Sequence, residues 1–334
     1  VKVGTGTLTI EGSLAYARTD GTFIDYSYWT GTNGIMTSGE ARLANGTTIQ
    51  YSVNGPGGLY PTRMTDPNGN YIIITYVNNQ GPNIQTVTDT LGRTITFHYD
   101  SSNRLTAITA PDLTTGTRTL VRLHYSQLTL GYHFSGLTAI ARDYYPWVID
   151  AIYYPGTGTG YWFDQSAGSY SSYGMLRKIS ERRGMTFSGP SPVPPGQGTT
   201  GQGTITAGQI TREQLYNYPL NTSDTTGTPG SNLTDAPTFT SLTESWTRDG
   251  TSTMDQAVTT YNVTTAGSVR TTTISQSNGT KIVQYSHNLP GNYLDGIVYE
   301  DRTLDSGNNV LQKSTVNWEQ GAYGTARPTR IEVT

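Results

Sequence analysis

The sequence predicts an all-β fold in which tandem β-hairpins form a continuous, curved or spiralling antiparallel sheet, and two observations support this prediction. A short pattern recurs after 23 residues, and its second copy repeats the Asp, Gly and Tyr of the first: Asp66 and Asp89, Gly69 and Gly92, Tyr76 and Tyr99. The composition, with 39 Gly, 24 Tyr and only 13% charged residues, suits strands that are joined by many turns.

Each copy of the pattern predicts a strand, a tight turn and a return strand. Residues 66–69 read Asp-Pro-Asn-Gly, in which Asp caps its own backbone, Pro presets φ and Gly tolerates a positive φ. Side chains then alternate between the two faces of the return strand. The apolar face comprises Ile72, Ile74 and Tyr76, then Ile95, Phe97 and Tyr99; the opposite face of the second copy comprises Thr94, Thr96 and His98. A single hairpin is marginally stable, so each copy needs the next one to bury its apolar face.

Further stretches repeat parts of this pattern. A third copy keeps its first half at residues 105–112 and closes less regularly at 120–125, so the best-defined repeats span 61–125. Residues 176–184 repeat the first strand and the turn, with Glu181 at the Asp position. Residues 328–334 restart the pattern and stop where the turn should come.

The repeated Ile/Val-Thr-Asp-x-x-Gly, followed seven residues after the Gly by Tyr, resembles the tyrosine-aspartate (YD) repeat of RHS proteins, a bacterial group that also resembles the teneurin shell. The resemblance implies a sheet that winds into a hollow shell, commonly around a C-terminal toxin. The implied partners are the rest of a longer RHS-type polypeptide or an enclosed cargo, and the implied location is secreted or at the bacterial cell surface. The self-cleaving segment of that family carries paired Asp-Pro-x-Gly motifs, and here only residues 66–69 match that string.

We expect three regions along the chain: an RHS/YD-like β-repeat region at 1–187, a loop-rich Pro/Gly/Thr segment at 188–237, and a further β-repeat region at 238–334 that continues the same sheet. Within the middle region, residues 189–203 are predicted to be a loop or linker, because prolines lack the N–H of a sheet ladder and glycines have no side chain to pack. A second polar loop is expected at about 219–237.

Strands are also predicted outside the best repeats. Residues 1–10 alternate, and turns at Asp20-Gly21 and Asn45-Gly46 precede aromatic-rich strands. Both ends look cut out of a longer polypeptide. Beyond the loops, we expect strands at 240–248, 257–263, 268–276 and 281–287, then a hairpin of 294–305 with 310–319.

The composition and motifs favour no catalytic function. A net charge of −3 and a pI near 5.8 give no electrostatic footprint for nucleic acid. There is no cysteine for disulfides or thiolate metal sites, and no apolar run approaches the length of a membrane span. No nucleophile elbow, metalloprotease helix or phosphate loop is found, so we predict no catalytic, cofactor-binding or metal-binding residues and no cofactor.

The residues that could carry chemistry each have a structural alternative. His98 and His124 directly precede repeat tyrosines, which favours sheet-face positions over a metal pair across adjacent strands; the other histidines are His133 and His287. Asp66 and Asp89 begin turns, which favours backbone capping over paired acid/base carboxylates. The turn at 305–308 lacks the spaced ligands of a calcium loop.

Two surface features of the sequence also have a functional and a structural interpretation. Glycosylation acceptor patterns begin at Asn45, Asn221, Asn232, Asn262 and Asn278, and in a Thr-rich chain such matches arise by chance. The aromatic run Tyr161, Trp162 and Phe163 is able to stack on sugar rings, whereas strand packing is the commoner use of such residues.

The sequence therefore predicts a non-catalytic structural protein, a wall segment of an RHS-type shell around a cargo or toxin polypeptide. The first alternative is a subunit of an extracellular filament or sheath, in which chains associate through open sheet edges by strand complementation. The second is a surface adhesin that binds glycans through exposed aromatic residues.

Overall fold

The structure is a computed structural model that describes residues 24–31, 34–112, 116–130, 145–163, 174–193, 197–218, 239–247, 254–321 and 324–334, together with the backbone of 13–17. Three predictions lie outside these residues: the alternating stretch at 1–10, the turn at Asp20-Gly21 and the polar loop at 219–237.

The prediction of an all-β fold built from sequential antiparallel hairpins is confirmed. Among the described residues, the one helical element is a single 3₁₀ turn, η1, at Val77–Asn79. The chain forms two compact units. Unit 1 comprises Val1–His124, Ile152–Gly158 and Thr186–Thr206, and unit 2 comprises Tyr125–Ala151, Thr159–Met185 and Ala207–Thr334.

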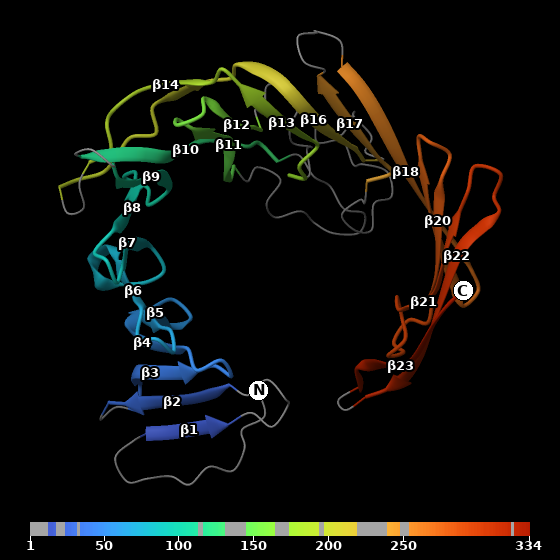
Figure 1. The fold of residues 1–334 in the computed structure, drawn as a ribbon, viewed down its shortest axis with the longest axis horizontal. Coiled ribbons are helices and arrows are strands. Elements are labelled where there is room, and N and C mark those ends of the chain that lie inside the picture. Colours follow the sequence, from blue (N-terminus) through green and yellow to red (C-terminus); the bar gives the residue numbers. More distant parts are fainter. Residues whose placement is uncertain are drawn as a thin grey trace. The chain divides into compact units, whose positions relative to one another are not determined.

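In unit 1, each strand from β1 to β10 pairs antiparallel with the next strand in the chain, an order that Figure 1 shows from blue to green. The last residues of β10 belong to unit 2. The strands are β1 Ser13–Ala17, β2 Asp25–Thr30, β3 Met36–Arg42, β4 Thr48–Gly55, β5 Gly58–Thr65, β6 Tyr71–Tyr76, β7 Ile84–Asp89, β8 Thr94–Tyr99, β9 Leu105–Pro111 and β10 Thr117–Gln127. A separate two-stranded sheet pairs β14 Thr186–Ser188 with β15 Thr204–Thr206.

The turns on one side of this sheet repeat every 23 residues. In the turns 43–47, 66–70 and 89–93, the N–H of the first residue donates to the carbonyl oxygen of the fifth at 2.8 to 3.1 Å, and the Asp112 N–H donates to the Gly116 carbonyl oxygen at 3.0 Å. The fourth residue of the first three is a glycine with φ of +82°, +87° and +78°, a conformation that side chains with a Cβ rarely adopt. The turn predicted at Asn45-Gly46 therefore belongs to the same 23-residue repeat.

The repeat tyrosines tie the return strand of each hairpin to its first strand. The Tyr76 hydroxyl donates to the carbonyl oxygen of Pro61, and the Tyr99 hydroxyl donates to that of Ile84, both at 2.7 Å. Tyr76 is only 4% exposed, and burial raises the pKa of its hydroxyl. A buried phenol needs such a partner, so the aromatic ring fills the sheet face while its hydroxyl satisfies a strand carbonyl.

In unit 2, the pairing again follows the chain, from β12 through β13 and then from β16 to β23. Phe239 contacts the rings of Tyr216, Tyr218 and Tyr261 edge-on, with centroids 5.0 to 6.2 Å apart. The strands, with β11 shared between the units, are β11 Trp147–Tyr154, β12 Thr159–Trp162, β13 Lys178–Arg183, β16 Gln209–Asn217, β17 Ser241–Thr247, β18 Met254–Ala266, β19 Val269–Gln276, β20 Lys281–His287, β21 Val298–Leu304, β22 Val310–Gln320 and β23 Ala326–Val333.

The strands predicted after residue 240 are confirmed, with differences at β18 and β21. β18 is longer than the predicted 257–263, since it spans Met254–Ala266, and β21 starts later than predicted. We expected that strand from residue 294, whereas it begins at Val298. Residues 289–297 form successive turns, in which Asn292, Asp295 and Ile297 each donate a backbone N–H to the residue three positions earlier. These local hydrogen bonds compete with sheet pairing.

The prediction that Glu181 begins a turn is wrong. Glu181 lies inside β13, where it faces Arg212 of β16 at 3.7 Å, and β13 pairs with β12 and β16 rather than with the segment that follows it. The turn needs a short carboxylate that reaches its own backbone, and the additional methylene of Glu directs its carboxylate to a neighbouring strand instead.

Replacing Tyr76 or Tyr99 by Phe should lower the free energy of unfolding by about 1 kcal/mol each, because each loses a hydroxyl hydrogen bond and leaves a strand carbonyl unpaired. Tyr71→Phe is the matched control, since its hydroxyl makes no hydrogen bond within the described residues. Chemical denaturation measures all three variants. Equal stability of Tyr76→Phe and Tyr71→Phe would contradict a structural role for the repeat hydroxyls.

Candidate functional site

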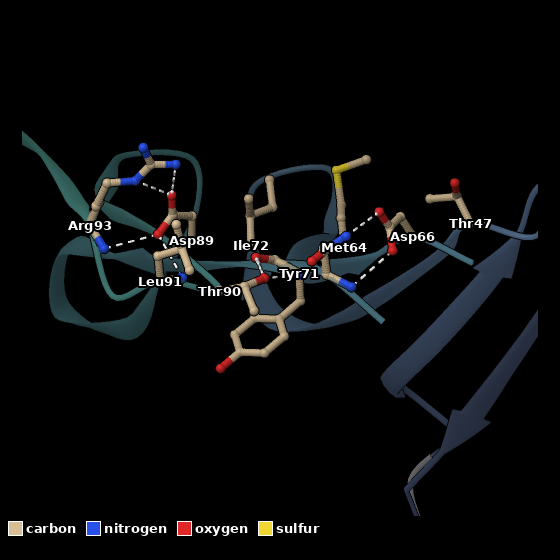
Figure 2. Close-up of a pocket in the computed structure, with 10 residues that line it drawn as sticks. Thr47, Met64, Asp66, Tyr71, Ile72, Asp89, Thr90, Leu91 and Arg93 are labelled. Atoms are coloured by element: carbon tan, nitrogen blue, oxygen red, sulfur yellow. Dashed lines mark hydrogen bonds and ion pairs between the residues drawn. The ribbon is translucent and has the colours of Figure 1, made fainter. Parts of the chain in front are cut away.

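Two turns of the repeat enclose a groove of about 500 Å³ (Figure 2). The turns 66–70 and 89–93 form its ends, and the apolar side chains of Met64 and Ile72 contribute to its lining. Thr90 joins the two copies: its Oγ1 accepts the Tyr71 N–H at 2.6 Å and lies 3.0 Å from the Tyr71 carbonyl oxygen. The groove is therefore the seam between consecutive repeats.

Asp66 and Asp89 cap their own turns, as the sequence analysis expected. In each turn, Oδ1 accepts the backbone N–H groups two and four residues later, at 2.8 to 3.0 Å. The side-chain hydrogen bond from Asn70 lowers the pKa of Asp66, and the one from Arg93 lowers the pKa of Asp89. Both carboxylates are thus held ionised by separate partners, an arrangement that suits turn capping and not a shared proton.

Among the described residues, the same five-residue turn with a capping Asp at its first position recurs at two further sites. Asp100 Oδ1 accepts the N–H groups of Ser102 and Arg104, and Asp305 Oδ1 accepts that of Asn309. The fourth residues, Asn103 and Asn308, have φ of +59° and +65°. At Asp305 the carboxylate is engaged by this turn, and no cluster of three or more metal-ligating side chains occurs in the described part of the chain.

The loop 189–203 is docked onto the β8–β9–β10 hairpins of unit 1. Thr200, which is 1% exposed, is its anchor. Its N–H donates to Tyr99 O at 2.8 Å, its carbonyl oxygen accepts from Thr106 Oγ1 at 2.9 Å, and its own Oγ1 accepts the Val193 N–H at 2.8 Å. The prediction that this segment forms no strand is confirmed for its described residues, and docking makes it a loop rather than a linker.

The His98 side chain binds the loop, and its imidazole is held in a single tautomer. Its Nδ1 lies 2.9 Å from the Val193 carbonyl oxygen, which only accepts, so Nδ1 carries the proton. Nε2 then accepts from the Thr109 hydroxyl at 2.8 Å. Burial, aided by the positive charge of Arg122, lowers the pKa of His98, which favours this neutral form.

A β-bulge places Thr106 at the loop. The register shifts between His98 and Tyr99, so that these residues face Ala107 and Leu105 and leave Thr106 without a partner across the ladder. Such bulges re-aim a side chain. Thr106 is completely buried, and its hydroxyl reaches the carbonyl oxygen of Thr200.

Arg122 is a buried cation under the loop. It is 4% exposed, its Nη2 donates to the Pro190 carbonyl oxygen at 3.0 Å, and its guanidinium lies 4.1 Å from the centre of the Phe187 ring. Gly203 makes room for that ring: φ is +66°, and a Cβ there would lie 2.5 Å from Phe187 Cε2. Burial lowers the pKa of Arg122, although a guanidinium still stays protonated.

The structure does not form the histidine pair that was considered as a metal site. His98 lies on β8 and His124 on β10, and β9 pairs between these strands. Both ring nitrogens of His98 are engaged by other groups. His287 packs against Tyr299 in unit 2, with centroids 4.7 Å apart, and His133 lies outside the described residues.

The aromatic run is divided between two kinds of contact. Tyr161 and Phe163 stack with centroids 6.4 Å apart, whereas Trp162 lies 5.7 Å from the guanidinium of Arg182. Among the glycosylation patterns, Asn45 and Asn278 each cap a turn by accepting the N–H two residues later. Asn221 and Asn232 lie outside the described residues.

Sequence-based reasoning identified the Asp caps but missed the Asp100 turn and the docking surface. The Asp100 turn carried a signal, because Asp-x-x-Asn-Arg matches Asp-x-x-Gly-Arg with Asn in place of Gly. The docking surface carried none, since its donors bind main-chain carbonyls of a segment some 70 to 95 residues away in the chain.

Residues 78–115 match the RHS Repeat family. This stretch contains β7, β8 and β9 and the capped turns at Asp89 and Asp100. The chain therefore carries an RHS repeat, and the resemblance found in the sequence is confirmed. No curated protein matches the chain.

Similar solved structures are distant. One is a porin-like protein from Bacteroides uniformis, with 12% identity, TM-score 0.24, and coverage of 96% of this chain and 94% of the other. Two others are structures of TcdB2-TccC3-TEV and TcdB2-TccC3, each with 10% identity, with TM-scores of 0.21 and 0.23 and with 93% and 92% of this chain covered. The chain spans 21% and 18% of their lengths. Within the described residues, no helix has the length and apolar character needed to cross a membrane.

Asp100→Ala should lower the free energy of unfolding by about 2 kcal/mol, because a carboxylate that is 7% exposed loses two backbone N–H groups and its ion pair with Arg104 at 2.8 Å. Asp89→Ala, in the same turn type with a side chain that is 27% exposed, is the matched control and should cost less. Denaturant titration of both variants tests this, and an equal loss would show that burial adds nothing to the cap.

His98 should make stability depend on pH. Its pKa is lowered in the folded state, so below about pH 6.5 the unfolded chain binds a proton that the folded chain excludes, and stability falls as the pH falls through this range. The loss approaches at most about 1.4 kcal/mol per pH unit.

His98→Asn keeps an N–H donor for Val193 but does not titrate. Unfolding free energies measured between pH 7.5 and 5.5 should fall more steeply for the unchanged chain than for His98→Asn. Carboxylates and guanidinium groups nearby ordinarily titrate outside this range, so identical slopes would contradict the assignment of a neutral His98.

Proposed function

We propose that this chain is a non-catalytic structural segment in the wall of a larger RHS-type shell, secreted or held at the bacterial cell surface, that encloses a polypeptide cargo such as a toxin. The observation that carries the proposal is the hairpin that repeats every 23 residues with the same capped turn and the same tyrosine tether. One of these copies, residues 84–99, lies within the stretch that matches the RHS Repeat family.

The contacts between repeats support a wall rather than a catalytic site. In the best-defined repeats, the groove of about 500 Å³ is a seam closed by Thr90 and Tyr71, and its two carboxylates are engaged in capping. Each repeat depends on its neighbours for burial, so the sheet extends by addition of hairpins. Enclosure by such a sheet would keep a partly unfolded cargo from folding or acting before release.

Electron microscopy of the native protein, combined with intact mass, tests the proposal. Hollow particles whose chains exceed 36.2 kDa, with an interior polypeptide that resists added protease, are the expected result. Fibres built from chains of about 36.2 kDa would overturn the shell and establish strand-completed polymerisation.

A matched pair of variants sharpens the protection measurement. Gly92→Val forces a β-branched residue into φ of +78°, which should open the seam and make the cargo sensitive to protease. Gly156→Val is the control, because a Cβ at that position meets open space and φ is ordinary. Equal cargo protection in the two variants would contradict a wall formed by these repeats.

A further inference from the structure

We propose that the surface formed by His98, Thr106 and Arg122 is a polypeptide-binding site, which the loop 189–203 occupies in cis and which an extended, proline-containing segment of the cargo binds in trans. The proposed function enters only in naming the cargo as the source of that segment. The binding surface itself rests on contacts within unit 1.

The three side chains bind backbone rather than side chains. They come from three successive strands and donate to the carbonyl oxygens of Val193, Thr200 and Pro190, respectively. Every polypeptide presents carbonyl groups, so these donors recognise an extended main chain of any compatible shape. Proline favours that shape because it restricts the unbound segment to extended conformations, so less conformational entropy is lost on binding. An extended proline-rich segment also makes no internal hydrogen bonds, so its carbonyl oxygens are available to the donors.

The loop has little structure apart from this surface. Its base is held by three residue pairs between β14 and β15, and its described residues between these strands form no further strand. A cavity of about 100 Å³ remains between the loop and the hairpin, and His98, Asp100, Val193 and Thr200 line part of it. The occupant is thus held by a few anchors, with space left beneath it.

Arg122 gives the surface a donor that the loop does not use. Its Nη1 is buried and has no hydrogen-bond partner, and no carboxylate pairs with this guanidinium in the described part of the chain. A buried cation with an unpaired N–H is costly. An incoming segment with a carboxylate beside the carbonyl that Nη2 binds would satisfy it, so the favoured partner carries Asp or Glu directly after a proline.

The test uses the full chain with residues 189–203 replaced by Gly and Ser at equal length, called the emptied variant. The probe is a fluorescent, N-acetylated and C-amidated peptide of residues 189–203, and fluorescence anisotropy measures its binding. Saturable binding to the emptied variant is expected, at least about tenfold tighter than to the unchanged chain, whose tethered loop competes at an effective concentration in the millimolar range.

Two further comparisons identify the site. In the emptied variant, Arg122→Gln should weaken binding about tenfold or more, whereas Arg118→Gln, at an exposed position of the same strand, should leave it unchanged. A peptide with Ser191→Glu, next to Pro190, should bind tighter than the parent peptide, and Arg122→Gln should remove that gain. A peptide of equal length composed of Gly and Ser should bind more weakly, because it lacks the prolines that favour the extended shape.

Absence of saturable binding to a folded emptied variant, or binding that Arg122→Gln does not weaken, would overturn the proposal. A concentration-dependent dimer of the unchanged chain that exchanges loops would instead assign the surface to a second copy. If the emptied variant does not fold, excess peptide added to the Thr200→Val chain should slow hydrogen exchange in β9, and unchanged exchange would overturn the site. The peptide-binding and hydrogen-exchange measurements do not depend on whether hollow particles form, so they test this site separately from the proposed function.

Discussion

The five-residue capped turn is the constraint on which the rest of this structure depends. Its first N–H binds the fifth carbonyl, and its fourth residue occupies the left-handed region, so each turn returns the chain in one register. A one-residue slip would move every side chain to the other face. Fixed turns therefore place each repeat tyrosine where its hydroxyl meets a carbonyl oxygen of the preceding strand, as Tyr76 of β6 meets Pro61 of β5.

The docked loop provides hydrogen-bond partners for polar side chains that the repeat places on a covered sheet face. The second copy places His98 on a sheet face that is polar in the sequence, and unsatisfied polar groups on a covered face are costly. The loop covers that face with main chain instead of apolar side chains, so that His98 and Thr106 find carbonyl partners. The strands thereby gain burial without an apolar layer, which fits a chain that is only 34% hydrophobic.

The sequence was sufficient for the features that local chemistry determines. The turn at Asp66, the alternation after it and β20 at Lys281–His287 were all predicted, since each depends on residues a few positions apart. The prediction of a turn at Glu181 was wrong, although the spacing of the surrounding residues matches the repeat, because the Glu side chain is longer than the Asp side chain that caps this turn. The docking surface could not be predicted, because its hydrogen bonds end on carbonyl oxygens, which every residue has, and leave no pattern of residue types.

The two kinds of contact also differ in how they stabilise the chain. Contacts between consecutive hairpins are local, so stability is approximately a sum over neighbours and a defect in one repeat stays near that repeat. The contact of Thr106 with Thr200 joins residues 94 positions apart. Closing a loop of this length costs only slightly more conformational entropy than closing a short one. The donor side chains that bind the loop all belong to β8, β9 and β10, so the surface is a property of the repeats and not of the loop that covers it.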